Sequence, residues 1–158
     1  MAASGLFYTA SFNNVSISNV AQNLWELIAA AGVPLIIHSI RLTITPTITS
    51  GVAQDVRAQL NVQRISTTGS GGSAKTPVAL NSRNTVAAST TANALVTTPG
   101  TAGNVLDSEN VSIIVPFERI YTPDQRIPVP AGTRIALNLS AGLGAAYNAS
   151  SEVYFEEI

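Results

Sequence analysis

The sequence contains no cysteine and a single histidine, His38, among its 158 residues. It can therefore form no disulfide, no thiolate metal site and no cysteine nucleophile. Any histidine-based metal site or Ser-His-Asp triad would depend on His38 alone. His38 is in phase with Ile36, Ile40 and Leu42 on an apolar strand face, so we interpret it as a core or interface residue. The sequence predicts no catalytic residue, no metal site and no cofactor.

Charge is also scarce. Charged residues make up 11% of the chain and the formal net charge is -1, whereas roughly 25% is usual in globular proteins. No basic field is available to bind nucleic acid or an anionic membrane, so neither is expected as a partner. The polar surface must consist mainly of Ser, Thr, Asn and Gln. Such a surface repels a neighbour weakly and loses little side-chain entropy on contact, which suits a protein that assembles.

Long uninterrupted apolar segments are missing too. The densest apolar stretch, residues 24–44, is interrupted by Glu26, Pro34, His38 and Arg41, so it does not predict a membrane span. Residues 2–5 show neither the basic nor the apolar part of a secretory leader, and we expect no such signal.

What the chain does contain is a two-residue alternation of apolar and polar side chains, which predicts β-strands. The clearest half-buried strand covers residues 55–63, where Val56, Ala58, Leu60 and Val62 alternate with polar residues. Seven or eight such strands, separated by turn signals, predict a single domain over residues 1–158. The expected fold is all-β, an antiparallel sandwich of jelly-roll type.

The N-terminal strand, about residues 5–12, has large side chains on both of its faces. Both faces therefore need cover, which either the rest of its own sheet or a neighbouring subunit could supply. The candidate contact residues for a subunit or a shell are Leu6, Phe7, Tyr8, Phe12 and His38.

One short inserted helix is predicted over about residues 20–31. Asn19 and Gln22 have the spacing of a capping box, and Gly32 with Pro34 would end the helix. The apolar residues at helical spacing are Val20, Leu24, Leu27, Ile28 and Ala31.

The stretch TTGSGGSAKTP, residues 67–77, misses the phosphate-loop pattern G-x-x-x-x-G-K-[ST] by one residue, because Ala74 stands where the second glycine belongs. A phosphate loop needs a buried parallel strand before it and a helix after it. The strand before it is half polar, and Pro77 with a non-helical segment follows. We therefore predict an exposed Gly/Ser connection with Lys75 in water.

Several separated parts of the chain together resemble the small capsid cement, or decoration, proteins of tailed bacteriophages. These parts are LFYTASF (residues 6–12), AQNLWELIAAAGVPLIIHSIRL (21–42), the Gly/Ser loop followed by TPVAL (76–80), IPVPAGTRIALNL (127–139) and VYFEEI (153–158). The resemblance implies a jelly-roll-like fold, a homotrimer, and binding to the major capsid protein on the outside of the virion. It also implies synthesis in the host cytoplasm and a non-enzymatic, shell-stabilising role.

Two other functions remain open from the sequence. One is a receptor- or glycan-binding head or fibre domain, because jelly rolls serve both purposes. The other is a small glycan hydrolase, which needs two facing carboxylates. Glu118 with Glu152 is the pair considered, and no sequence feature favours it.

Overall fold

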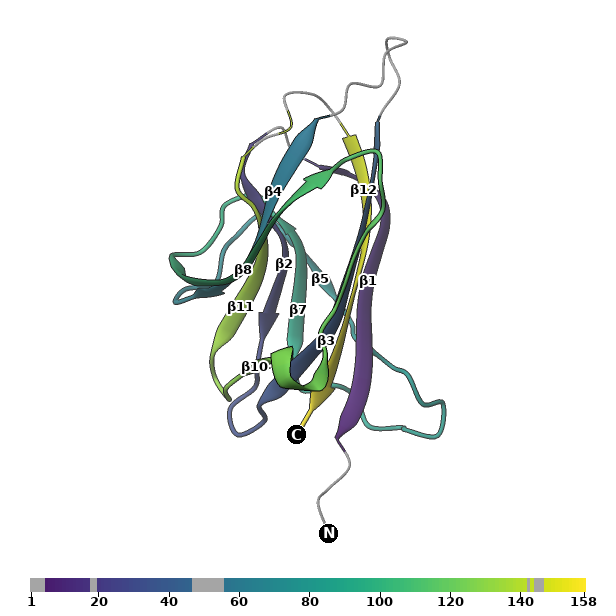
Figure 1. Cartoon of the computed structure of the whole chain (residues 1–158). Helices are drawn as coiled ribbons and strands as arrows, with labels where there is room; N and C mark the ends of the chain where they lie inside the picture. Colours follow the sequence, from purple (N-terminus) through teal and green to yellow (C-terminus); the bar gives the residue numbers. More distant parts are fainter. Residues whose placement is uncertain (1–4, 18–19, 47–55, 142, 144–146) are drawn as a thin grey trace.

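The computed structural model describes residues 5–17, 20–46, 56–141, 143 and 147–158. Within these ranges the chain forms two antiparallel β-sheets that face each other (Figure 1). The predicted all-β antiparallel sandwich is therefore confirmed. Asn19, Asp55 and residues 1–4, where no secretory signal was expected, lie outside the described residues.

The first sheet has the order β10-β3-β12-β1-β6, and β9 also pairs with β3. The long pair β1–β12 runs from Leu6 opposite Glu157 to Ile17 opposite Tyr147. The strands of the first sheet are β1 (Leu6–Ile17), β3 (Leu35–Pro46), β6 (Val78–Ala79), β9 (Phe117–Ile120), β10 (Ile127–Val129) and β12 (Tyr147–Glu157).

The second sheet has the order β5-β7-β2-β11-β4-β8. A short 3-10 helix, η1 (Pro123–Gln125), lies between β9 and β10. The strands of the second sheet are β2 (Gln22–Ile28), β4 (Arg57–Ile65), β5 (Ser73–Lys75), β7 (Thr91–Val96), β8 (Ala102–Ser112) and β11 (Arg134–Leu139).

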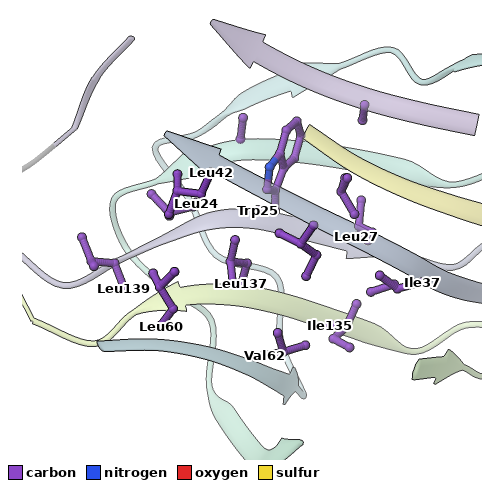
Figure 2. Close-up of a cluster of buried hydrophobic side chains, with 14 of the residues drawn as sticks. Leu24, Trp25, Leu27, Ile37, Leu42, Leu60, Val62, Ile135, Leu137 and Leu139 are labelled. Carbon is purple, nitrogen blue, oxygen red and sulfur yellow. The ribbon is translucent and has the colours of Figure 1, made fainter. Parts of the chain in front are cut away.

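The core lies between the two sheets, where inward-facing side chains from both sheets meet. Buried and half-buried positions alternate along all of β12. Figure 2 shows side chains of β2, β3, β4 and β11 converging in this space. The largest fully buried side chains include Trp25, Tyr8, Phe155, Leu24, Leu27, Leu35 and Leu42.

The helix predicted over about residues 20–31 is wrong, because Gln22–Ile28 is the buried strand β2. The pairing of β2 with β11 shifts between Asn23 and Trp25, which leaves Leu24 as the extra residue of a β-bulge. Leu24, Trp25 and Leu27 all belong to the core. A strand with one extra residue thus places apolar side chains at a spacing that imitates a helix. Burial of both faces of the strand outweighs the weak helical preference of the segment.

Candidate functional site

The outward-facing side of the first sheet carries the most distinctive group of exposed and half-exposed side chains, and we call it the outer face. A cross-strand row spans five strands of this sheet, because Thr9 pairs with both Val78 and Tyr154, Tyr154 pairs with Ser39, and Ser39 pairs with Ile120. Side chains paired across strands share one face of a sheet. The row therefore brings residues from five distant segments onto one surface.

One end of the outer face is apolar and aromatic. The ring of Phe7 meets the ring of His38 edge to face, with 5.3 Å between centroids. Val78 and Ile120 are 63% and 66% exposed, and Phe7 is 43% exposed. We call Phe7, His38, Val78 and Ile120 the apolar end of the outer face. These side chains extend across the sheet, from Val78 on the edge strand β6 to Ile120 on β9, with Phe7 and His38 between them. Exposed apolar side chains on one face are typical of interaction surfaces.

His38 reaches the outer face because of a β-bulge. Tyr154 pairs with Ser39 and Phe155 pairs with Ile37, which leaves His38 as the extra residue. The bulge reverses the phase of β3, so that Ile37 and Ile40 are both buried while the His38 side chain is 16% exposed. The Nε2 atom of His38 lies 3.0 Å from Glu156 Oε2. The prediction that His38 is in phase with Ile40 and Leu42 is therefore wrong, because a strict two-residue period does not include the extra residue of a bulge.

A charged band borders the apolar end on the outer face. Arg41 Nε donates to Glu118 Oε1 at 2.5 Å, and Arg41 Nη1 lies 3.9 Å from Glu152 Oε2. Glu152 Oε1 also accepts a hydrogen bond from Thr9 Oγ1 at 3.0 Å. The Arg41 guanidinium lies 5.7 Å from the centroid of the Tyr154 ring. The charges of this band are thus paired within the protomer.

Two pKa values in the charged band are raised. The hydrogen bond and the charge of Glu118 raise the pKa of Arg41. Desolvation, followed by the hydrogen bond with Glu152, raises the pKa of Tyr154. Glu118 and Glu152 do meet as the sequence left open, but they meet across Arg41 on an exposed sheet face. A glycosidase pair has to face a scissile bond in a cleft, so this geometry gives no support to hydrolysis.

The five candidate contact residues are divided by the fold. Phe7 and His38 lie together on the outer face, and Leu6 is half-buried against the core. Tyr8 and Phe12 are core residues, and Tyr8 stacks on Phe155 at 5.8 Å between centroids. Tyr8 and Phe12 are therefore not accessible to a neighbour. Val78 and Ile120 were missed because their exposure depends on pairing with distant strands.

The near phosphate-loop also has a structural explanation. Gly69 N donates to the buried carboxylate of Glu26 at 3.0 Å, and Ser70 forms a bridge with Thr98. The antiparallel strand β4 precedes this stretch and residues 73–75 of it form the antiparallel strand β5, where a phosphate loop needs a parallel strand and a helix. The backbone N–H of Gly69 is thus directed inward, away from any phosphate. Our expectation of a merely exposed connection is wrong at Gly69, which packs over Glu26.

Gly69→Ala should lower the free energy of unfolding by about 1–3 kcal/mol through overpacking. A Cβ atom at this position would lie 2.5 Å from the Thr98 carbonyl oxygen and 2.6 Å from Glu26 Oε1. Urea denaturation followed by circular dichroism measures the change. Lys75→Ala, in the same motif, is the matched control and should leave stability nearly unchanged. Equal stability of the two variants would contradict the close packing at Gly69.

Among the described residues, no group of three or more His, Cys, Asp or Glu side chains could hold a metal ion. In the same part of the chain, no helix is long and apolar enough to cross a membrane. Comparison with protein-family models, with curated proteins and with solved structures gave no significant match.

Proposed function

We propose that this chain is a non-enzymatic structural protein of a virion, a decoration protein that binds the outside of a phage head as a homotrimer and stabilises the shell. The observation that carries the proposal is the apolar end of the outer face, where Phe7, Val78 and Ile120 are all more than two-fifths exposed. Covering such a surface removes apolar area from water and favours association. The resemblance to phage cement proteins supplies the setting for that association.

The order of the strands supports the finer description of the fold as a jelly roll. The strand pairs are nested, because β1 pairs with β12, β2 with β11, β3 with β9 and β10, and β4 with β8. Nested antiparallel pairs distributed over two sheets result when one long hairpin is rolled into a sandwich. Jelly rolls of this kind are common in viral capsid domains.

The charged band explains why this association should need few ionic contacts. Arg41 already pairs with Glu118 and Glu152 within the protomer, and the whole chain carries a formal net charge of -1. Apolar and neutral polar contacts therefore dominate between subunits and with the shell. Screening by salt weakens exposed charge pairs but not apolar contacts, so binding should depend little on salt.

Trimerisation gives a physical basis for shell stabilisation. A trimer that engages three capsid subunits gains avidity of ~10²-fold or more without any new type of contact. Neighbouring capsid subunits can then separate only when several contacts break together. The barrier to rupture under internal DNA pressure rises accordingly.

The oligomeric state tests the proposal. Light scattering behind size exclusion should give a trimer at micromolar concentration, at low and at high salt. The double variant Phe7→Asp with Ile120→Asp should be a folded monomer, because it places charge in the apolar end. The double variant Ile114→Asp with Val115→Asp is the matched control, since these exposed residues lie in the turn between β8 and β9 and not on a strand of the first sheet, and it should remain trimeric. A wild-type chain that is a clean monomer would contradict the proposal.

Binding to the shell is measured separately. The wild-type protein mixed with undecorated capsids should show saturable binding, and decorated capsids should resist heating better than bare ones. A trimer that binds capsids without saturation, or not at all, would refute the decoration role.

A further inference from the structure

We propose that a pocket at the open edge of the sandwich binds a neutral saccharide. The pocket has a volume of about 330 Å³ and is lined by Leu106, Asp107, Arg119, Tyr121, Gln125 and Ile127. It lies at the edge of the sandwich where β8, an edge strand of the second sheet, faces β9 and β10 at the edge of the first sheet. Its volume is at the small end of the range for small-molecule sites. This inference goes beyond the decoration role and does not depend on it.

The charge of the pocket selects against anions. Arg119 Nε lies 3.0 Å from Asp107 Oδ2, and Arg119 Nη2 donates to Glu109 Oε2 at 2.7 Å and to Asp107 Oδ1 at 3.2 Å. Two carboxylates thus neutralise one guanidinium. The positive charge of Arg119 is therefore already paired, and it is not free to hold a phosphate or a carboxylate.

The polar groups of the pocket match the hydroxyl groups of a sugar. Tyr121 donates its hydroxyl proton to Asp107 Oδ2 at 3.2 Å. Burial, together with the neighbouring Asp107 carboxylate, raises the pKa of Tyr121 above its usual range, so the phenol stays protonated. Asp107 Oδ1 is contacted by Arg119 Nη2 alone and keeps a lone pair that can accept a further hydrogen bond. Among the described residues, Arg119 Nη1 makes none of the ion pairs or hydrogen bonds of that guanidinium. Each sugar hydroxyl both donates and accepts, and it needs such acceptors and donors side by side.

The wall of the pocket is held in place before any ligand arrives. Tyr121 N donates to the carbonyl oxygen of His38 at 2.9 Å, which anchors the segment to β3. Gln125 N and Arg126 N both donate to the carbonyl oxygen of Thr122, at 2.8 and 3.1 Å. Preorganised walls reduce the entropy lost on binding. Gln125 is exposed at this wall and offers an amide that can both donate and accept, while Leu106 and Ile127 supply apolar surface for the C–H groups of a sugar ring.

Nuclear magnetic resonance of the ¹⁵N-labelled full chain tests the proposal. The probes are methyl glycosides of the common hexoses, 6-deoxyhexoses, pentoses and N-acetylhexosamines, with methyl glucuronide and inorganic phosphate as anionic probes. At least one neutral glycoside should shift the backbone amides of residues 106–107 and 119–127 with a saturable dose dependence. Methyl glucuronide should bind no more tightly than methyl glucoside, and inorganic phosphate no more tightly than the best neutral glycoside.

Variants connect the binding to the pocket. Gln125→Ala should raise the dissociation constant about fivefold to tenfold, as expected for the loss of one or two hydrogen bonds to a ligand. Tyr121→Phe keeps the ring and should weaken binding through the loss of the anchored hydroxyl. Gln59→Ala is the matched control, because Gln59 lies on β4 outside the pocket lining, and it should bind like the wild type.

Three outcomes would overturn the proposal. They are a panel of neutral glycosides that leaves these amides unshifted at tens of millimolar, tighter binding of phosphate or glucuronide, and equal weakening by Gln125→Ala and Gln59→Ala. Because Gln125 is exposed, its replacement should leave the fold intact, and the amide spectrum of the unliganded variant verifies this directly.

Discussion

Trp25→Ala should lower the free energy of unfolding by about 3–5 kcal/mol, which is the usual effect of truncating a buried large aromatic side chain. Trp25 projects from β2 in the second sheet across the core, and it is 2% exposed (Figure 2). Its ring lies 5.2 Å from the ring of Phe12 between centroids. Its Nε1 atom donates to Ser151 Oγ at 2.9 Å, and Ser151 Oγ donates in turn to the carbonyl oxygen of Arg41 at 2.7 Å. One side chain thus links β2 with β1, β12 and β3.

Circular dichroism during urea denaturation measures this effect, because the chain has a single tryptophan and its removal abolishes the fluorescence probe. Trp25→Phe is the matched control. It keeps an aromatic ring in the core but loses the N–H donor, so its loss of stability should be clearly smaller than that of Trp25→Ala. A loss below about 1 kcal/mol for Trp25→Ala would contradict the bridging role, since surface substitutions give changes of about half that size.

Glu26→Ala should lower the free energy of unfolding by about 2–4 kcal/mol. Glu26 is fully buried beneath the Gly69 loop, and it accepts hydrogen bonds from Asn23 Nδ2 at 2.7 Å and from Gly69 N at 3.0 Å. Asn138 Nδ2 extends this network by donating to Asn23 Oδ1 at 2.7 Å. Removing the carboxylate leaves one buried and one partly buried donor without this acceptor, and an orphaned buried group costs about 1–3 kcal/mol. The effect should therefore rival the loss of a large core side chain.

Two control variants test whether the lost hydrogen bonds of Glu26 cause this effect. Glu26→Gln keeps one carbonyl oxygen as an acceptor and should lose less stability than Glu26→Ala. Glu118→Ala removes an equally charged but exposed partner of Arg41, and its effect should be far smaller because exposed ion pairs contribute little. Equal unfolding midpoints for Glu26→Ala and Glu118→Ala would contradict the stabilising role of the buried network.

The regular strands were predictable from the sequence because their periodicity is local. The alternation around Leu60 in β4 is found where it was expected, with Ala58, Leu60 and Val62 all buried. A strand that faces a core on one side repeats every two residues whatever its partners are. The all-β class and the antiparallel sandwich follow from several such segments.

The candidate site could be predicted only in part. Phe7 and His38 were named from the sequence, and the structure brings them into contact. Val78 and Ile120 join them only through pairing with strands about 70 and 80 residues away in the chain. A local pattern contains no information about which strands become neighbours, because the same alternation fits many strand orders.

By itself, the sequence determined the β class, the low charge, the absence of thiol chemistry and the alternating core positions, since these depend on composition and local period. Only the tertiary structure decided the rest. Two β-bulges, at Leu24 and His38, turn an apparent helix into a strand and take His38 out of phase with Ile40 and Leu42. A bulge forms where two particular strands pair out of step. The burial of Glu26 beneath Gly69 likewise depends on a loop that reaches it from another part of the chain.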